Sequence, residues 1–521
     1  MPRLFTLMLM LLFLCSAMAA RAADSFTFSN PPGPHAVGVK VVQQYDRSRL
    51  YKTAIDLYTG EPAQGERARP IQVLVWYPAA QGGKRLSFRD YLDTSMGEDD
   101  FTRSAAERRR FADRLIEEGG GARRAALLRD LARPMLAVRD ARAKQGRFPV
   151  VVYAPGFSAS AIENADLCEY LASHGYVVLA SPSLGEHRRE TTLTAEGLEP
   201  QARDISWLIG FADTLAHADT GRLAVAGFSW GGLANMVAAA RDPRIKALVS
   251  LEGSVRYFPE LVDGGKDAVR NVSPARVAVP LLYVGARPEP DEAPSKDPAP
   301  SFIDGMRYAD VVLVTLEPMR HVDFSSLNGR FAADSDFVSH TRDEVATAYG
   351  WAARYTLRFL DAQLKGDAAG RAFIDNTPAA NGAAGNLVTV DIRRKTQDPA
   401  PGWESFVARL RAQGFEHAIP VYTQLQAQGA SFKVERNDFI GWATALKQRG
   451  RFAQAREIFR LGDHLYPSLW AKLDLAEMQV KTGEVQAAAQ TYRTIIALEP
   501  DNDTARAWLR RHESDDATSP P

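Results

Sequence analysis

One serine of this chain has the sequence context of a nucleophile. Residues 227–231 read Gly-Phe-Ser-Trp-Gly, between a predicted strand at 222–226 and a helical pattern at 232–240. A tight turn from a buried strand into a helix presents a serine hydroxyl at the carboxyl end of a sheet, and glycines are needed because the two elements approach closely. We therefore predict that Ser229 attacks an acyl carbon.

A serine hydroxyl needs a base that takes its proton, and His321 is placed to be that base. It follows the apolar run at 311–316, and a histidine after the last strand completes the order serine, acid, histidine. His187 follows an earlier strand, so it is out of order for the base although it can line the pocket. Four further histidines lie in helical or tail segments: His340, His417, His464 and His512.

The acid that orients the histidine has two candidates. Glu252 directly follows the apolar run at 247–251, immediately after the unit of the nucleophile, and Asp291 lies in the loop after the next run, at 281–284. A carboxylate in either place holds the imidazole in one tautomer and stabilises the imidazolium that forms. Glu252 is our first choice, and Asp291 is the alternative.

Two backbone amides are needed to stabilise the oxyanion that forms when an acyl carbon is attacked. We expect one from Trp230, directly after the nucleophile, and one from Phe157, in the loop after the apolar run at 150–153. The chain has no His-Glu-x-x-His motif, its histidines are scattered, and no glycine-rich phosphate loop follows a strand. We therefore expect neither a metal ion nor another cofactor.

The elements that must position these residues alternate along the chain. Short runs rich in β-branched residues alternate with helical patterns, and the later runs are almost continuously apolar, as parallel strands buried on both faces require. The pattern predicts a doubly wound, mostly parallel α/β sheet. The runs are residues 71–77, 149–153, 176–180, 223–226, 247–251, 281–284 and 311–316.

The sheet region is expected to span residues 24–365, closed by a helix at 341–365. Residues 84–146 interrupt it with an Arg-, Ala- and Leu-rich helical insertion, which is either an outer decoration or a lid over the active site. Residues 366–435 are rich in Ala, Gly, Asn and Pro at their start and are predicted to be a connector with helices. Residues 513–521 are predicted to be a disordered tail.

The C-terminal region, residues 436–512, contains a repeat with an offset of 33 residues. Gly450, Phe452, Ala455, Phe459 and Pro467 recur as Gly483, Val485, Ala488, Tyr492 and Pro500. This pattern resembles the tetratricopeptide repeat, in which small residues let paired helices approach and Pro ends the second helix. Two copies are fewer than independent stability normally needs, so we expect them to pack on helices from 403–435 or on the sheet domain. Such a tail is also a candidate surface for a protein partner.

The composition limits the classes of partner and location. Lys plus Arg and Asp plus Glu both number 63, so the net charge is zero and nothing favours nucleic acid or an anionic membrane surface. Residues 1–23 combine Arg3, an apolar run at 4–14 and small residues, the pattern of a cleaved secretory signal. We expect a periplasmic or secreted protein without a stable membrane anchor, in which the one remaining cysteine, Cys168, is a buried thiol.

Four segments resemble the α/β-hydrolase branch that contains platelet-activating-factor acetylhydrolases and dienelactone-hydrolase-like proteins: residues 69–78, 148–157, 171–178 and 227–232. The resemblance covers about residues 40–365 and implies a Ser-His-acid triad that cleaves an ester through an acyl-enzyme. It favours Glu252, since the acid in these acetylhydrolases follows the strand after the nucleophile, although that acid is usually Asp. It places the second oxyanion donor on Phe157, where Ala-Pro-Gly replaces the more usual His-Gly.

The leading hypothesis is a carboxylic-ester hydrolase for a small-molecule substrate. A peptidase on the same scaffold is an alternative, but it would usually need a propeller or an extended lid, and the sequence has no propeller repeats. A third hypothesis is an inert sheet domain whose helical tail binds a protein partner, against which the intact Ser229 and His321 argue.

Overall fold

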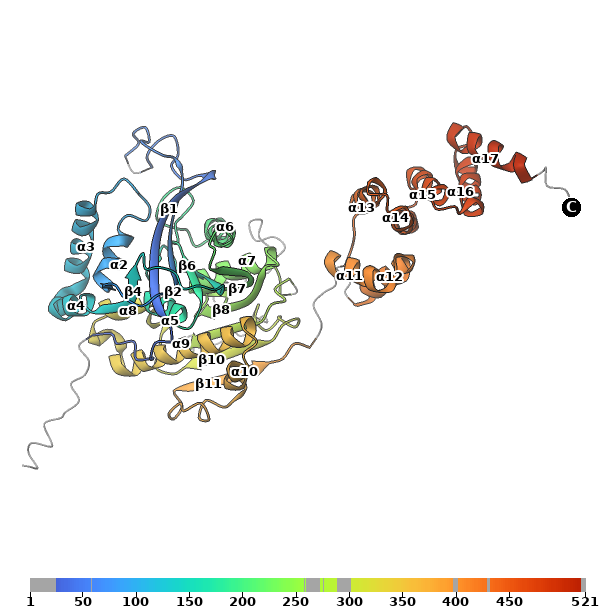
Figure 1. Ribbon diagram of the computed structural model, residues 1–521. Helices are drawn as coiled ribbons and strands as arrows, with labels where there is room; N and C mark the ends of the chain where they lie inside the picture. Colours follow the sequence, from blue (N-terminus) through green and yellow to red (C-terminus); the bar gives the residue numbers. More distant parts are fainter. Residues whose placement is uncertain are drawn as a thin grey trace, which may run out of the picture. The chain divides into compact units, whose positions relative to one another are not determined.

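The structure, a computed structural model, describes residues 25–57, 59–256, 258, 272–274, 276–287, 301–396, 402–428 and 432–516. The chain divides into two compact units, residues 1–398 and 399–521 (Figure 1). The predicted secretory signal at 1–23 and the alternative acid Asp291 lie outside the described residues.

An eleven-stranded sheet forms the first unit, in the order β11-β10-β9-β8-β7-β5-β6-β2-β1-β4-β3. β2 (Ala68–Ala79) joins β6 antiparallel, and β1 (Ala36–Leu50) pairs antiparallel with β2. The predicted doubly wound, mostly parallel α/β sheet is confirmed. Its centre consists of six parallel strands: β5 (Phe148–Ala154), β6 (Val177–Ala180), β7 (Ala218–Phe228), β8 (Ile245–Leu251), β9 (Leu281–Ala286) and β10 (Val311–Leu316).

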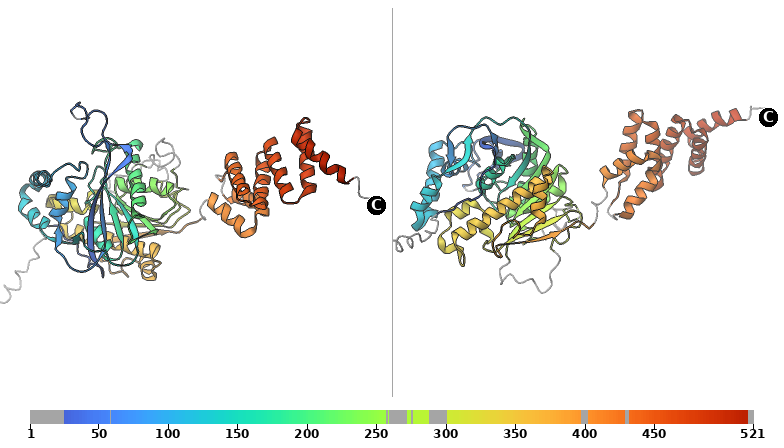
Figure 2. Two further views of the ribbon diagram at one scale, coloured as in Figure 1. Left: turned by 45° about the horizontal axis from the view of Figure 1, so that its top comes forward. Right: turned by 60° about the horizontal axis from the view of Figure 1, so that its bottom comes forward.

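Helices cover both faces of this sheet (Figures 1 and 2). Successive side chains of a strand point to opposite faces, so β7 sends Ala224 and Ala226 to one core cluster and Leu223 and Val225 to the other. Burial on both faces is why the central strands are almost wholly apolar. The covering helices are α5 (Ala165–Ser173) and α9 (Arg342–Leu364) on one face, and α6 (Ala195–Ala212) and α7 (Trp230–Arg241) on the other.

The insertion predicted at residues 84–146 contains strands as well as helices. Glu169 of α5 anchors it, because its buried carboxylate accepts hydrogen bonds from the Tyr91 hydroxyl and from the Leu136 and Ala137 amides. These contacts make the insertion a packed outer layer, which favours decoration over a lid. Its elements are β3 (Arg85–Ser87), α2 (Phe88–Ser95), α3 (Ala105–Gly120), α4 (Arg124–Leu131) and β4 (Pro134–Arg139), which pairs with β1 at the sheet edge.

The segment predicted as a connector from residue 366 begins with two further elements of the first unit. α10 (Ala368–Asp375) packs on α9, and β11 (Val388–Arg393) pairs antiparallel with β10. Val388 is buried and the side chains at 390 and 392 are half-buried, while those between them are exposed. The prediction of a connector is therefore wrong for residues 366–396. The physical reason is that an edge strand needs apolar side chains only at every second position.

The second unit consists of helices (Figure 2). Helices α11 and α12, which the sequence assigned to the connector, share a hydrophobic cluster with α13 and α14 through Phe406, Leu410 and Tyr422. Of the two predicted arrangements, the repeats therefore pack on helices from 403–435. The elements are α11 (Trp403–Gln413), α12 (Ala418–Gln428), α13 (Arg436–Gln448), α14 (Phe452–Leu465), α15 (Leu469–Lys481), α16 (Val485–Leu498) and α17 (Asp503–Asp516).

The helix bounds keep the period of the sequence repeat. α15 begins 33 residues after α13, and α16 begins 33 residues after α14. Gly450 and Gly483 follow α13 and α15 with φ of +70° and +80°, a conformation that favours glycine at helix ends. The tetratricopeptide assignment stays a prediction. α17 continues through residues 513–516, which were predicted to be disordered. In the part of the chain that the structure describes, no helix is long and apolar enough to span a bilayer.

Candidate active site

Ser229 occupies a strained turn between β7 and α7. Its φ of +53° and ψ of −117° lie in a region that side-chain-bearing residues rarely adopt. The turn is held by the end of β8, since the Ser229 amide donates to the Leu251 carbonyl at 3.0 Å and the Ser254 amide donates to the Ser229 carbonyl at 2.9 Å. This is the geometry that aims a serine hydroxyl out of the carboxyl edge of the sheet.

The glycines beside Ser229 are required by close contacts of backbone with backbone. A Cβ atom on Gly231 would lie 2.1 Å from the Ala154 carbonyl oxygen, and one on Gly227 would lie 2.8 Å from the same atom. The nucleophile turn therefore sits directly against the end of β5, from which the predicted oxyanion loop begins. Only glycine permits this approach, which explains the spacing found in the sequence.

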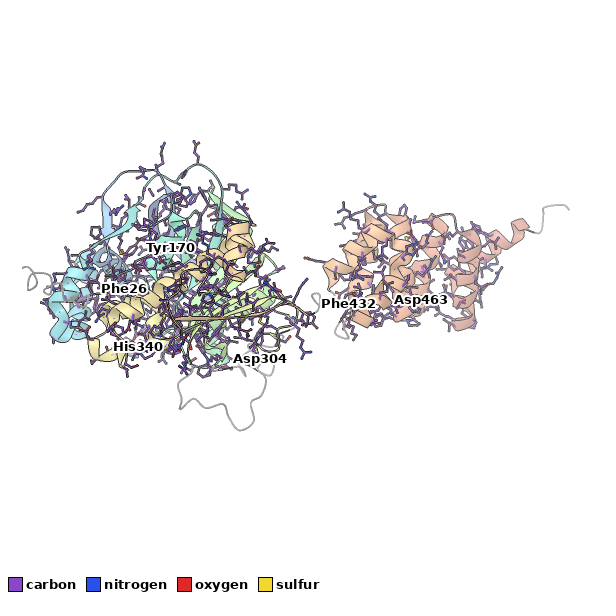
Figure 3. All side chains as sticks on the ribbon, turned by 90° about the horizontal axis from the view of Figure 1, so that it is seen from below. Phe26, Tyr170, Asp304, His340, Phe432 and Asp463 are labelled. Atoms are coloured by element: carbon purple, nitrogen blue, oxygen red, sulfur yellow. The ribbon has the colours of Figure 1, made fainter. Side chains whose placement is uncertain are left out.

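His321 reaches Ser229 across two strands. β8 and β9 separate β10 from β7 in the sheet, yet the loop after β10 brings His321 Nε2 to 2.8 Å from Ser229 Oγ. The turn that carries the imidazole is closed by Asp323, whose carboxylate accepts from the Arg320 amide at 2.8 Å. His340, by contrast, lies just before α9 (Figure 3).

Glu252 lies fully buried where β8 ends, with a φ of +42°. Its amide donates to the Val284 carbonyl of β9 at 2.7 Å, and its Oε2 accepts from the Ala286 amide. The Arg256 guanidinium lies 3.9 Å from the other carboxylate oxygen. The structure thus places Glu252 at the ends of the strands between Ser229 and His321, while the choice between Glu252 and Asp291 as the acid stays a prediction.

The two predicted oxyanion donors lie on segments that face each other. The Phe157 and Trp230 rings meet edge to face, with centroids 5.7 Å apart. Neither amide donates a hydrogen bond to any of the described residues. Donors without a protein partner are what an oxyanion hole requires, and the assignment of these two amides to one stays a prediction.

The sequence pattern did not indicate Glu163, a carboxyl group beneath the predicted oxyanion loop. It is buried, and its Oε2 accepts from the Gly156 amide at 2.8 Å. Burial raises the pKa of Glu163 to about 8, against the lowering effect of that hydrogen bond. The available signal was an acidic residue between Ile162 and Asn164, a few positions after the predicted oxyanion loop.

Asn164 links this loop to the segment after the histidine. Its amide nitrogen donates to the Tyr153 hydroxyl and to the Phe324 carbonyl, and its oxygen accepts from the Ser326 amide at 2.8 Å and the Tyr349 hydroxyl at 2.7 Å. A single buried amide thus joins β5, α9 and the turn that carries His321. Such a fully satisfied buried group favours one arrangement of the loops around it.

We expect Glu163→Gln to stabilise the protein at alkaline pH. Between pH 4.5 and about 8 the folded state keeps the Glu163 proton and the unfolded chain releases it, so folding stability falls as pH rises. Each such group lowers the free energy of unfolding by about 1.4 kcal/mol per pH unit over that range. Gln does not titrate, so it removes this contribution to the pH dependence. The melting temperature measured from pH 5 to 9 should show a gain for Glu163→Gln that grows up to about pH 8.

Glu169→Gln provides the matched comparison for that prediction. Burial raises the pKa of Glu169 to about 7, so its stability gain should stop growing about one pH unit earlier. A gain for Glu163→Gln that does not change with pH would contradict the assignment of a proton to the folded carboxyl group.

Two further expectations from the sequence concern a metal site and Cys168. Among the described residues there is no group of three or more His, Cys, Asp or Glu side chains that could hold a metal ion. Cys168 is buried in α5, and burial raises the pKa of its thiol well above the ordinary value. Nothing in its surroundings marks it as a nucleophile, because a reactive cysteine has a lowered pKa.

Comparisons with known proteins find similarity over part of the chain. The chlorophyllase family model matches residues 124–252. A protein of Methylorubrum extorquens assigned as a carboxymethylenebutenolidase is 30% identical over 167 residues, which cover 29% of this chain and 55% of that protein. A bis(hydroxyethyl) terephthalate hydrolase of Streptomyces coelicolor is 33% identical over 110 residues, 20% of this chain and 33% of that protein.

Both matches span only part of these relatives, about half of the first and a third of the second. Among solved structures, a ferulic acid esterase from Streptomyces cinnamoneus aligns with a TM-score of 0.47 and 19% identity, covering 70% of this chain and 98% of that one.

Proposed function

We propose that the chain is a serine hydrolase of the α/β-hydrolase superfamily that cleaves a small-molecule carboxylic ester. The observation that carries the proposal is the 2.8 Å distance between Ser229 Oγ and His321 Nε2, in a strained turn at the carboxyl edge of the sheet. A hydroxyl paired with an imidazole in this way is an activated nucleophile.

The reaction proceeds in two halves that use the same residues. His321 Nε2 takes the Ser229 proton as Oγ attacks the acyl carbon, and the amides of Phe157 and Trp230 bind the resulting oxyanion. His321 then gives the proton to the leaving alcohol oxygen, which leaves an acyl-enzyme. In the second half water attacks the acyl carbon while His321 takes a proton from the water. His321 then returns this proton to Ser229 Oγ as the carboxylic acid leaves. Glu252, or alternatively Asp291, stabilises the imidazolium.

The names of two relatives support the proposed substrate class. The names of the two relatives describe a carboxymethylenebutenolidase and a hydrolase of bis(hydroxyethyl) terephthalate, which is a carboxylic ester. Both matches support ester cleavage over peptide cleavage. The helical unit contains none of the proposed catalytic residues, so we propose that it serves a separate role, such as binding a protein partner.

Labelling with a fluorophosphonate probe tests the proposal. We expect the wild-type chain to be labelled at one serine and Ser229→Ala to remain unlabelled, because the probe needs an activated hydroxyl. Ser206→Ala is the matched control, since Ser206 lies on α6 and its hydroxyl donates only to the Ala202 carbonyl among described partners. Esters of p-nitrophenol and peptide anilides of p-nitroaniline then separate an esterase from a peptidase. A folded wild-type chain that takes no label would refute the proposal.

A further inference from the structure

The insertion contacts the predicted oxyanion loop through one fully buried side chain, that of Glu98. This residue lies just beyond the end of α2, in a turn where its amide donates to the Ser95 carbonyl at 3.3 Å. The sequence pattern does not distinguish it from its acidic neighbours Asp99 and Asp100. Its contacts are with loops at the carboxyl edge of the sheet, whereas Tyr91 and the strand β4 dock the rest of the insertion on α5.

Both carboxylate oxygens of Glu98 bind segments that follow central strands of the sheet, β5 and β6. Oε2 accepts from the Ser160 hydroxyl at 2.9 Å and from the Ala161 amide at 3.4 Å. Oε1 accepts from the Arg189 guanidinium at 2.6 Å. Ser160 follows Phe157 by three residues, and a hydrogen bond to a charged group is about twice as strong as one between neutral groups.

Glu98 also contacts the predicted oxyanion loop indirectly, through Arg189. The segment after β6, which contains Arg189, also holds the oxyanion loop, because the Thr191 amide donates to Ser158 Oγ at 2.9 Å and the Ser183 amide donates to the Ala159 carbonyl at 2.9 Å. Ser158 has a φ of +53°, a strained conformation that persists only when its surroundings enforce it. Glu98 thus fixes one side of the loop directly and the other through Arg189.

We propose that Glu98 is a positioning residue, through which the insertion at residues 84–146 sets the place of the Phe157 amide in the oxyanion hole. The inference rests on the proposed esterase function. In this role the insertion is neither a lid nor an outer decoration. One of its side chains holds the loop whose amide binds the developing negative charge. Misplacing a group in an active site by about 1 Å can cost a hundredfold in rate.

The test compares Glu98→Ala with Tyr91→Phe in the full-length protein. Tyr91→Phe removes two buried hydrogen bonds of the insertion, one to Glu169 of α5 and one from Trp76 of β2, so it reports on docking alone. We expect Glu98→Ala to lower kcat for p-nitrophenyl acetate by about 10- to 100-fold with KM changed by less than about threefold. Affinity for phenylboronic acid, whose serine adduct places an oxygen in the oxyanion hole, should fall in parallel. Tyr91→Phe should lower the melting temperature and keep kcat.

Glu98→Gln keeps an oxygen for the Ser160 hydroxyl, so it should recover most of the kcat lost in Glu98→Ala. Should Glu98→Ala fail to fold, Ser160→Ala removes the hydroxyl that donates to Glu98 and is expected to lower kcat by about three- to tenfold. The proposal is overturned if the folded variant keeps kcat within about twofold of wild type.

Hydrogen exchange separates failure of this inference from failure of the proposed function. Amides of residues 156–161 should exchange faster in Glu98→Ala than in wild type or Tyr91→Phe, whether or not the protein hydrolyses esters. A wild-type chain without fluorophosphonate labelling refutes the esterase. Unchanged exchange in Glu98→Ala refutes the positioning role.

Discussion

Replacing His321 by glutamine is expected to lower kcat for ester hydrolysis by about four to six orders of magnitude. The Nε2 atom that lies 2.8 Å from Ser229 Oγ is then lost, and an amide cannot take up the serine proton or return it to the leaving alcohol. A loss of this size corresponds to about 5–8 kcal/mol of transition-state stabilisation. Binding of the substrate should change little, because the imidazole acts on the reacting atoms.

The measurement is single-turnover and steady-state hydrolysis of p-nitrophenyl acetate at pH 7.5 to 8. His340→Gln is the matched control, since His340 is also half-buried but lies before α9 and should keep full activity. Circular dichroism should show both variants folded. An activity of His321→Gln within about tenfold of wild type would mean that another group serves as the base.

The core of the candidate site was predictable because its signals are local. The turn at Ser229 needs a strand, a glycine-flanked serine and a helix in one continuous segment, and the order of strands then restricts the histidine to the loop after β10. The contact between Ser229 and His321 follows from that order, because carboxyl ends of parallel strands meet at one edge.

The residues that support the site were not predictable, because their roles arise from contacts between distant segments. Glu98 meets Ser160 across 62 positions of sequence, and in the sequence it is one acidic residue among several. Glu163 adjoins its loop, yet its raised pKa depends on burial by other parts of the fold. A charge pattern carries no information about burial until the tertiary structure is known.

The edge of the sheet was missed for a related reason. β11 has three inward apolar side chains separated by polar ones, and β4 has a similarly weak pattern within the insertion. Central strands are buried on both faces and appear as continuous apolar runs, but edge strands are stabilised largely by pairing with a neighbour. The sequence of residues 388–393 was therefore not enough to predict a strand, because this strand is stabilised by its pairing with β10.

Gly231→Ala is expected to cost about 3–5 kcal/mol of folding stability. The new Cβ would lie 2.1 Å from the Ala154 carbonyl oxygen and 2.6 Å from that of Pro155. Both contacts are backbone atoms, so no side chain can rotate away, and the end of β5 must move. Since β5 leads into the loop that carries Phe157, activity should fall more than stability alone explains.

Gly210→Ala supplies the matched control for that change. Gly210 lies in α6, and a Cβ there would meet nothing within 4 Å. Alanine is the better helix former, so this variant should gain about 0.5–1 kcal/mol. Urea unfolding followed by the near-ultraviolet signal of the first unit gives both stabilities, and ester hydrolysis under native conditions gives the activities. Equal stability of the two variants would show that the end of β5 yields freely, in which case Gly231 would not be what holds the oxyanion loop against the nucleophile turn.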